Sequence, residues 1–264
     1  MSLSALVGVS LAPVASYAGS FAPAAEQSGS TAVANTSSDI VAWATGVADL
    51  TRGPADIQSP MDGDVTFGTA DEALGAAEGT STAVVSLGDG GSITLTFDQA
   101  ITNGAGADFA VFENGFSDTF LELAFVEVSS NGTDFFRFDA ISETQTSTQV
   151  GGFGALDPTN LYNLAGKYRQ AFGTPFDLEE LVGVSASLDT DAITHVRLVD
   201  VIGSIDPNFG TTDSLGNLVN DPYSTPFSSG GFDLDGVGVI NVVPEPTTLA
   251  LLGLSLTASI RRKR

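Results

Sequence analysis

The stretch VVSLGDGGSITLTF (residues 84–97) decides the fold class. Its second half, SITLTF (Ser92–Phe97), alternates apolar residues with threonine, which is typical of a β-strand with one buried face. The GDGG segment between the two apolar runs is a turn sequence, so the stretch predicts a β-hairpin.

Further short strand-like runs follow along the chain, separated by turns rich in Gly and Asp. The Asn131-Gly132 pair lies between two of them and predicts a second hairpin. Helical signals are few, the clearest being Asp177 as the N-cap of LEEL. Many short strands with Gly-rich turns favour an all-β fold, a single β-sandwich or jelly-roll-like domain over residues 36–241. The main strand-like runs are 108–116, 120–138, 192–201 and 233–242.

The charge of the chain excludes one class of partner. The 264 residues carry 32 Asp and Glu against nine Lys and Arg, for a net charge of −23, and four of the nine cations are the last four residues. A surface this negative repels phosphate backbones, so we expect no nucleic-acid binding. The chain has no cysteine, which excludes disulfides and thiolate sites, and its 42% hydrophobic residues indicate a folded core rather than disorder.

The first 35 residues predict two segments outside the domain. Residues 1–18 contain a short apolar run and end in SYA, which is typical of a signal peptide and its cleavage site. No basic residue precedes the run, so we expect the beginning of this signal to be truncated. Residues 19–35 are small and polar without periodicity, and they predict a linker.

The tail combines three features in order. Pro244 and Pro246 precede an uncharged, largely apolar run of 14 residues, 247–260. As a helix this run would be roughly 21 Å long, shorter than a bilayer core of about 30 Å. The basic residues that follow should stay in the cytoplasm, so we expect a short hydrophobic helix that holds the chain in the membrane with its domain outside. The alternative is a buried C-terminal helix of the domain. The four basic residues are Arg261, Arg262, Lys263 and Arg264.

Residues 242–264 resemble a PEP-CTERM sorting signal, in which Pro-Glu-Pro, an apolar helix and a basic cluster follow one another. The matching tripeptide is Pro244, Glu245 and Pro246. The resemblance implies an exported protein that is tethered in the inner membrane as a precursor. It further implies processing by an exosortase, a membrane-embedded enzyme, and delivery to the cell envelope, surface or extracellular matrix. Residues 80–241 resemble a bacterial secreted cell-surface domain of uncharacterised function, which supports one β domain.

The sequence offers little for catalysis. His195 is the one histidine and lies within a strand-like run, where a structural role is expected, and no Gly-x-Ser-x-Gly motif or cysteine is present. Glycoside hydrolysis needs two carboxyl groups at a set separation, and 32 acids single out no pair. We therefore predict that the protein is not an enzyme.

Calcium is the ligand that best matches so many carboxylates, because Ca²⁺ binds six to eight oxygen atoms from closely spaced acids, amides and turns. Three clusters place such groups together and are candidate sites of structural calcium. The alternative is that they form Asx-turns and solubilising charge. The clusters are Asp206, Asn208 and Asp213; Asp108, Glu113 and Asn114; and Asp233 with Asp235.

Sugar contacts are expected from tyrosines in loop-like sequence, namely Tyr162, Tyr168 and Tyr223, whereas the 17 phenylalanines suit a core. The leading hypothesis is an exported, non-enzymatic cell-surface or matrix protein, sorted by its tail and stabilised by calcium. The alternative is a carbohydrate-binding module for extracellular polysaccharide, and a secreted glycoside hydrolase is the third hypothesis.

Overall fold

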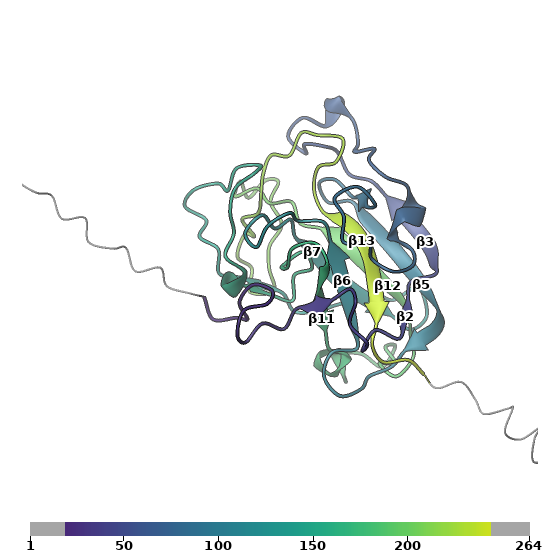
Figure 1. The fold of residues 1–264 in the computed structure, drawn as a ribbon. Helices are drawn as coiled ribbons and strands as arrows, with labels where there is room; N and C mark the ends of the chain where they lie inside the picture. The colour runs from purple at the N-terminus through teal and green to yellow at the C-terminus, as the bar shows by residue number, and fades with distance from the viewer. Residues whose placement is uncertain (1–18, 244–264) are drawn as a thin grey trace, which may run out of the picture.

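The computed structural model describes residues 19–243, which form a sandwich of two antiparallel β-sheets with long loops (Figure 1). This confirms the all-β, sandwich-like fold. The predicted signal peptide, residues 1–18, and the tail from residue 244, with its expected short helix, lie outside the described residues.

The first sheet has the strand order β1-β11-β6-β13-β2, and β4 pairs with β13 beside this path. Its two longest neighbours, β6 and β13, lie antiparallel with Val237 opposite Val111. Its strands are β1 (Val33–Ala34), β11 (Phe172–Phe176), β6 (Phe109–Glu113), β13 (Asp233–Val239), β2 (Ala42–Trp43) and β4 (Val85–Ser86).

The second sheet has the order β3-β5-β12-β7-β8, and a separate pair joins β9 to β10. The carboxylate of Asp177 accepts a hydrogen bond from the backbone N of Glu179 at the start of η4, which confirms the predicted cap. The strands are β3 (Gly46–Thr51), β5 (Ser92–Ile101), β12 (Ile193–Asp200), β7 (Ala124–Ser129), β8 (Phe136–Arg137), β9 (Ile141–Ser142) and β10 (Leu161–Tyr162). The 3-10 helices are η1 (Pro60–Asp62), η2 (Ala70–Ala73), η3 (Pro158–Asn160) and η4 (Leu178–Leu181).

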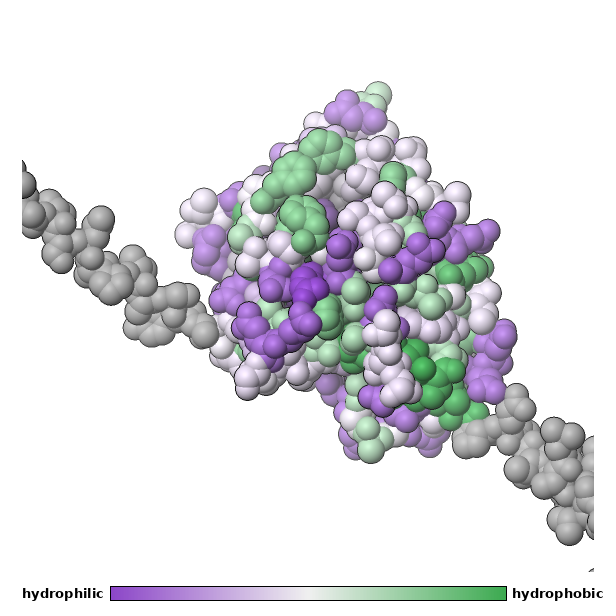
Figure 2. Space-filling model, viewed as in Figure 1, coloured by the Kyte–Doolittle hydropathy of each residue, from purple (hydrophilic) through white to green (hydrophobic). Residues whose placement is uncertain are grey.

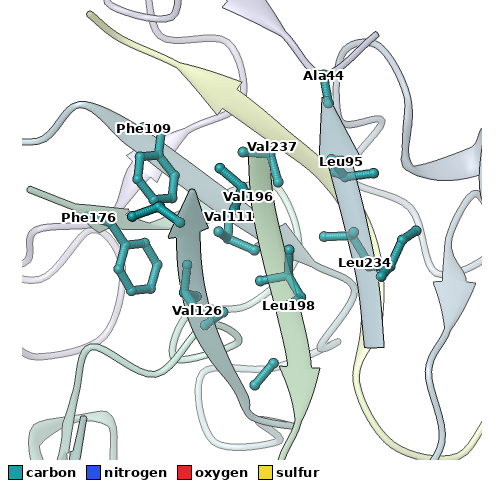
Figure 3. Close-up of a cluster of buried hydrophobic side chains, with 14 of the residues drawn as sticks. Ala44, Leu95, Phe109, Val111, Val126, Phe176, Val196, Leu198, Leu234 and Val237 are labelled. Carbon is teal, nitrogen blue, oxygen red and sulfur yellow. The ribbon is translucent and has the colours of Figure 1, made fainter. Parts of the chain in front are cut away.

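The core lies between the two sheets, as the close-up of buried side chains shows (Figure 3). Ile93 and Leu95 of β5 are fully buried in it, as the alternation in SITLTF predicts. Val111 of β6 and Leu198 of β12 bring the opposite sheets to the same cluster. Burial of these side chains supplies the main driving force for the fold.

The hairpin predicted from GDGG is wrong. Strand β4 pairs with β13 of the first sheet, whereas β5 pairs with β3 and β12 of the second. The backbone N of Gly91 donates to the carbonyl of Gly88 at 2.8 Å, so a tight turn is present, but it carries the chain from one sheet to the other. A turn sequence predicts that the chain reverses direction, but it does not predict with which strand each flanking segment pairs. The hairpin predicted at Asn131-Gly132 is confirmed, because β7 pairs with β8.

Residues 19–35, predicted to be a linker, pack on the domain instead. Strand β1 pairs with β11, with Val33 opposite Gly173. The ring of Phe21 stacks on Tyr162, with centroids 5.2 Å apart, and its backbone N donates to the carbonyl of Thr159 at 2.9 Å. Further hydrogen bonds and an ion pair between Glu26 and Arg169 also hold this segment on the domain, although it has no periodic pattern.

The strand ends bring several acidic residues to one end of the sandwich. Strand β6 ends at Glu113, β12 ends at Asp200, and β13 begins at Asp233. Glu122 lies two residues before the start of β7. Since neighbouring strands run antiparallel, the end of one lies beside the start of the next, and the four carboxylates gather in one region.

Candidate functional site: an aromatic-lined acidic cleft

Four phenylalanines form a continuous row at the acidic end of the sandwich. Phe116 and Phe120 stack with ring centroids 4.3 Å apart, Phe120 and Phe153 are 5.9 Å apart, and Phe153 and Phe227 are 5.6 Å apart. We call these four residues the phenylalanine row.

The phenylalanine row is exposed to solvent along most of its length. Phe116, Phe153 and Phe227 are 60%, 72% and 46% exposed, whereas Phe120 is buried. Hydrophobic residues reach the surface in patches separated by hydrophilic ones, as on the face shown in Figure 2. A group of adjoining exposed rings on a folded domain commonly marks a binding surface.

A cleft of about 380 Å³ opens beside the row, which lines it. Its polar lining includes Asn114, Glu122 and Asp233. These three side chains are all buried, so they lie deeper than the exposed rings. We call Glu122 and Asp233 the acidic floor of the cleft.

The two carboxylates of the acidic floor differ in their hydrogen bonds. Asp233 accepts one from the hydroxyl of Ser86 and one from Nδ2 of Asn114, at 3.1 Å. The carboxylate of Glu122 makes no hydrogen bond with any residue that the structure describes. Glu113 lies nearby: its Oε2 accepts from the backbone N of Gly115 at 2.7 Å, and its buried Oε1 has no partner among residues 19–243. An acceptor left without a donor in a buried position costs free energy.

The electrostatics follow from this arrangement. Burial raises the pKa of Glu122 well above its ordinary value, and repulsion from Glu113 and Asp233 adds to the rise. Burial also raises the pKa of Glu113 well above the ordinary value. For Asp233, burial raises the pKa to about 6, although its bonds with Ser86 and Asn114 act in the opposite direction. The floor therefore holds excess negative charge whenever these groups ionise.

Other acids at this end serve as loop anchors. Asp200 accepts from the backbone N of Phe232 at 2.7 Å and of Gly90 at 3.0 Å, and Asp221 accepts from the backbone N of Leu123 at 2.8 Å. Gly231 has a φ of 73°, and a Cβ there would lie 2.7 Å from Oδ1 of Asp200. These bonds fix the loops that carry the cleft.

The structure brings three of the predicted calcium ligands together, namely Glu113, Asn114 and Asp233. Asp235 is directed to another segment, where it accepts from the backbone N of Glu78 and of Gly79.

The remaining predicted ligands lie elsewhere. Asp108 accepts from the backbone N of Gly104 and Leu178, both at 2.7 Å. Asp206 and Asn208 form an exposed Asx-turn, and Asp213 caps a separate turn through the backbone N of Leu215 and of Asn217. Within residues 19–243, no three acidic or histidine side chains are arranged to share a metal ion. Calcium binding stays a prediction.

The predicted tyrosine contacts are dispersed. Tyr162 lines a second hollow of about 600 Å³, but its hydroxyl donates to Oε1 of Glu180 at 3.0 Å. Lys167, in the same hollow, donates to the carbonyl of Leu161 at 2.6 Å, and burial lowers its pKa to about 8. The charged and phenolic groups of Tyr162 and Lys167 therefore already have partners, in contrast to Glu122, whereas the hydroxyl of Thr174 in the same hollow has none among the described residues.

Tyr168 and Tyr223 are both buried, and their hydroxyls bond with Thr31 and Asp56 at 2.8 Å each. They are packing residues and line neither cleft. His195 bonds with the hydroxyl of Thr194 at 2.8 Å beside Phe135, as expected for a structural histidine.

Sequence reasoning missed the phenylalanine row and Glu122. The stretch NGFSDTFLEL contains Phe116, Phe120 and Glu122, yet nothing in it distinguishes an exposed phenylalanine from the many that fill the core. The Gly- and Ser-rich surroundings of Phe116, Phe153 and Phe227, with Pro226 directly before Phe227, were the available signal of a loop position.

Comparison with known proteins identifies the tail. Residues 242–264 match the PEP-CTERM protein-sorting motif, which covers the sorting segment and not the folded domain. No curated protein matches the chain significantly. Among residues 19–243, no helix has the length and apolar character needed to cross a bilayer. The motif supports an exported, membrane-processed protein of the cell surface that is sorted by an exosortase.

Proposed function

We propose that the protein is a non-enzymatic surface or matrix protein that binds extracellular polysaccharide in the aromatic-lined cleft. The phenylalanine row beside a buried polar floor carries this proposal. A sugar ring has apolar C–H faces and polar hydroxyl edges, and such a ligand suits stacked aromatic side chains with a few convergent polar groups.

The row also suits a polymer rather than a single sugar. Its four rings continue from Phe116 to Phe227 with neighbouring centroids 4.3 to 5.9 Å apart, so an extended chain can contact more than one exposed ring. Because three of the rings are exposed, the surface is open to a long ligand.

The tail supports the location of this function. We propose that Thr247 to Ile260 hold the precursor in the inner membrane and that the basic quartet is removed during processing. Mass spectrometry of the protein from the finished surface fraction should find no Arg261–Arg264. An intact terminus in that fraction would contradict this step.

Binding is tested with the full chain in mild detergent, by affinity electrophoresis through gels that contain purified exopolysaccharide. The replacements Phe116→Ala and Phe153→Ala remove exposed rings of the row and should weaken binding at least about tenfold, which corresponds to 1.4 kcal/mol. Phe209→Ala is the matched control, because Phe209 is 36% exposed and does not line the cleft. Equal loss in all three variants, or no binding by the parent chain, would contradict the proposal.

A secreted glycoside hydrolase is the second candidate, because two carboxylates, Glu122 and Asp233, line the same cleft. Hydrolysis of this kind uses one carboxylic acid with a raised pKa and one carboxylate. Release of new reducing ends from a bound polysaccharide, abolished by Glu122→Gln, would favour this activity. Binding without any release favours the non-enzymatic function.

A further inference from the structure

We propose that the polysaccharide bound in the cleft carries protonated amino groups, as a partly or fully deacetylated amino-sugar polymer does. This inference rests on the proposed function and specifies the class of glycan. The juxtaposition that carries it is an unbonded acidic side chain, Glu122, at the floor of a cleft lined by exposed aromatic rings.

Glu122 provides the first argument. Its side chain is 6% exposed, it lines the cleft, and its carboxylate makes no hydrogen bond with the part of the chain that the structure describes. An ammonium group has three N–H donors and no acceptor, and an ionised carboxylate has acceptors and no donor. The two groups satisfy each other, and hydrogen bonds between opposite charges are stronger than neutral ones.

The surrounding charges give the second argument. Glu113, Asp233, Asp221 and Asp200 all act on Glu122 with the same sign as its own charge. Arg52 acts on Asp233 with the opposite sign, but its guanidinium already donates to the carbonyls of Phe67, Gly68 and Ser86. A ligand cation would therefore relieve repulsion, whereas an anionic polysaccharide would increase it.

The phenylalanine row gives the third argument. A cation beside an aromatic face gains further attraction, and the same rings accommodate the C–H face of the sugar. A divalent ion is the less suitable cation, because no three acidic side chains of residues 19–243 are arranged to share a metal. A singly charged amine on a sugar needs fewer acceptors than a divalent ion. It would contact the acidic floor while the sugar ring contacts the phenylalanine row.

Binding should also release protons. In the free protein, burial and the four acids named above keep the pKa of Glu122 raised. An amine that arrives protonated stabilises the ionised carboxylate, so Glu122 loses its proton to solvent as the complex forms. A neutral sugar in the same cleft would leave that proton in place.

The test uses isothermal titration calorimetry of the full chain in mild detergent. The ligands are chitosan oligosaccharides, N-acetylated chitooligosaccharides, cellooligosaccharides and alginate oligosaccharides, measured in two buffers of different ionisation enthalpy. The deacetylated oligomers should bind at least about tenfold more tightly than their acetylated counterparts. The heat should differ between buffers in the sense of proton release.

Three variants identify the site. Glu122→Gln keeps the size of the side chain and should abolish both the preference for amines and the proton release. Glu72→Gln, at an exposed glutamate of η2 outside the cleft, should change neither. Phe153→Ala should weaken charged and neutral ligands alike.

The outcomes separate this inference from the proposed function. Equal binding of acetylated and deacetylated oligomers would overturn the inference and leave polysaccharide binding intact. A preference for amines that survives Glu122→Gln would overturn the assignment to this cleft. Failure of every glycan to bind would overturn both.

Discussion

Nδ2 of Asn114 lies 3.1 Å from Oδ2 of Asp233, a contact that joins the residue after β6 to the first residue of β13. It supports the acidic floor, because the amide donates to a buried carboxylate that otherwise accepts only from Ser86 among the described residues. Asn114 also donates to the carbonyl of Ser81, at 3.3 Å. One amide therefore fixes two loops and one carboxylate.

Replacing Asn114 with Ala should destabilise the domain by about 1–3 kcal/mol, because a buried carboxylate loses a donor. The loss should be largest near pH 7.5, where Asp233 is ionised, and smaller near pH 5, where it is protonated. Denaturant unfolding at both pH values measures the difference. Asn217→Ala is the control, since Asn217 is exposed and does not line the cleft. An equal loss at both pH values would contradict this explanation.

The protein should be most stable in mildly acidic solution. Burial raises the pKa of both Asp89 and Asp233 from 3.8 to about 6. A carboxyl group with a raised pKa in the folded state holds its proton more tightly than in the unfolded chain. Its contribution is therefore complete below about pH 4 and is lost as the pH rises through 6.

Each of these two shifts corresponds to about 3 kcal/mol at full ionisation, since one pKa unit is worth 1.36 kcal/mol. Thermal melts between about pH 4.5 and 8 should therefore show a falling melting temperature. Glu113, Glu122, Asp200 and Asp221, whose pKa values are raised further by burial, should extend the decline above pH 6. A melting temperature that rises over this range would contradict the prediction.

Glu122→Gln should stabilise the free protein at neutral pH. The replacement removes an ionisable group from a buried position surrounded by like charges, and no hydrogen bond with a described residue is lost. The gain should be greatest at about pH 8 and near zero at about pH 3, where Glu122 is protonated in both the folded and the unfolded protein. Paired melts of the parent and variant chains measure it, and a destabilised variant at pH 8 would show that Glu122 has a favourable partner.

Calcium stabilisation remains testable by the same method. If Glu113, Asn114 and Asp233 bind the ion after a small rearrangement, excess calcium should raise the melting temperature at pH 7.5 relative to chelator. The effect should be lost at about pH 4.5, because the carboxyl groups of Glu113 and Asp233, whose pKa values are raised by burial, are then largely protonated. Asp213→Asn should retain the response, since Asp213 caps a separate turn. Identical melting curves with calcium and with chelator would contradict stabilisation by calcium.

Local patterns in the sequence predicted the fold class well. The alternation in β5 identified its buried face, and Asn131-Gly132 identified a real hairpin, because each depends on neighbours along the chain. The hairpin predicted from GDGG was wrong because both flanking strands pair with strands that are distant in sequence. Strand β4 pairs with β13 near Asp233, and β5 pairs with β12.

The candidate site was harder to predict for the same reason. The phenylalanine row is assembled from three loops, and no single segment shows that Phe120 meets Phe153 or that Glu122 is left without a donor. The acidic residues were too numerous for the sequence to single out any pair. Glu122 and Asp233 lie in one cleft because the folded sheets bring the start of β7 and the start of β13 to the same region. The tyrosines were predicted as sugar contacts from their residue type alone. Tyr168 and Tyr223 are instead buried in the domain, which the sequence does not reveal.

Strand β13 has Asp233 at one end, and from its other end the chain continues into the sorting segment, which begins at residue 242. Its seven residues span roughly 23 Å in an extended strand, so Asp233, at the floor of the cleft, lies about that far from Val239, where the strand ends and the chain continues towards the tail. In the tethered precursor of the proposed function, the attachment would therefore be separated from the floor of the cleft by the length of β13. Capture of a polymer would then need no prior detachment, and cutting the tail would set free a molecule that is already loaded.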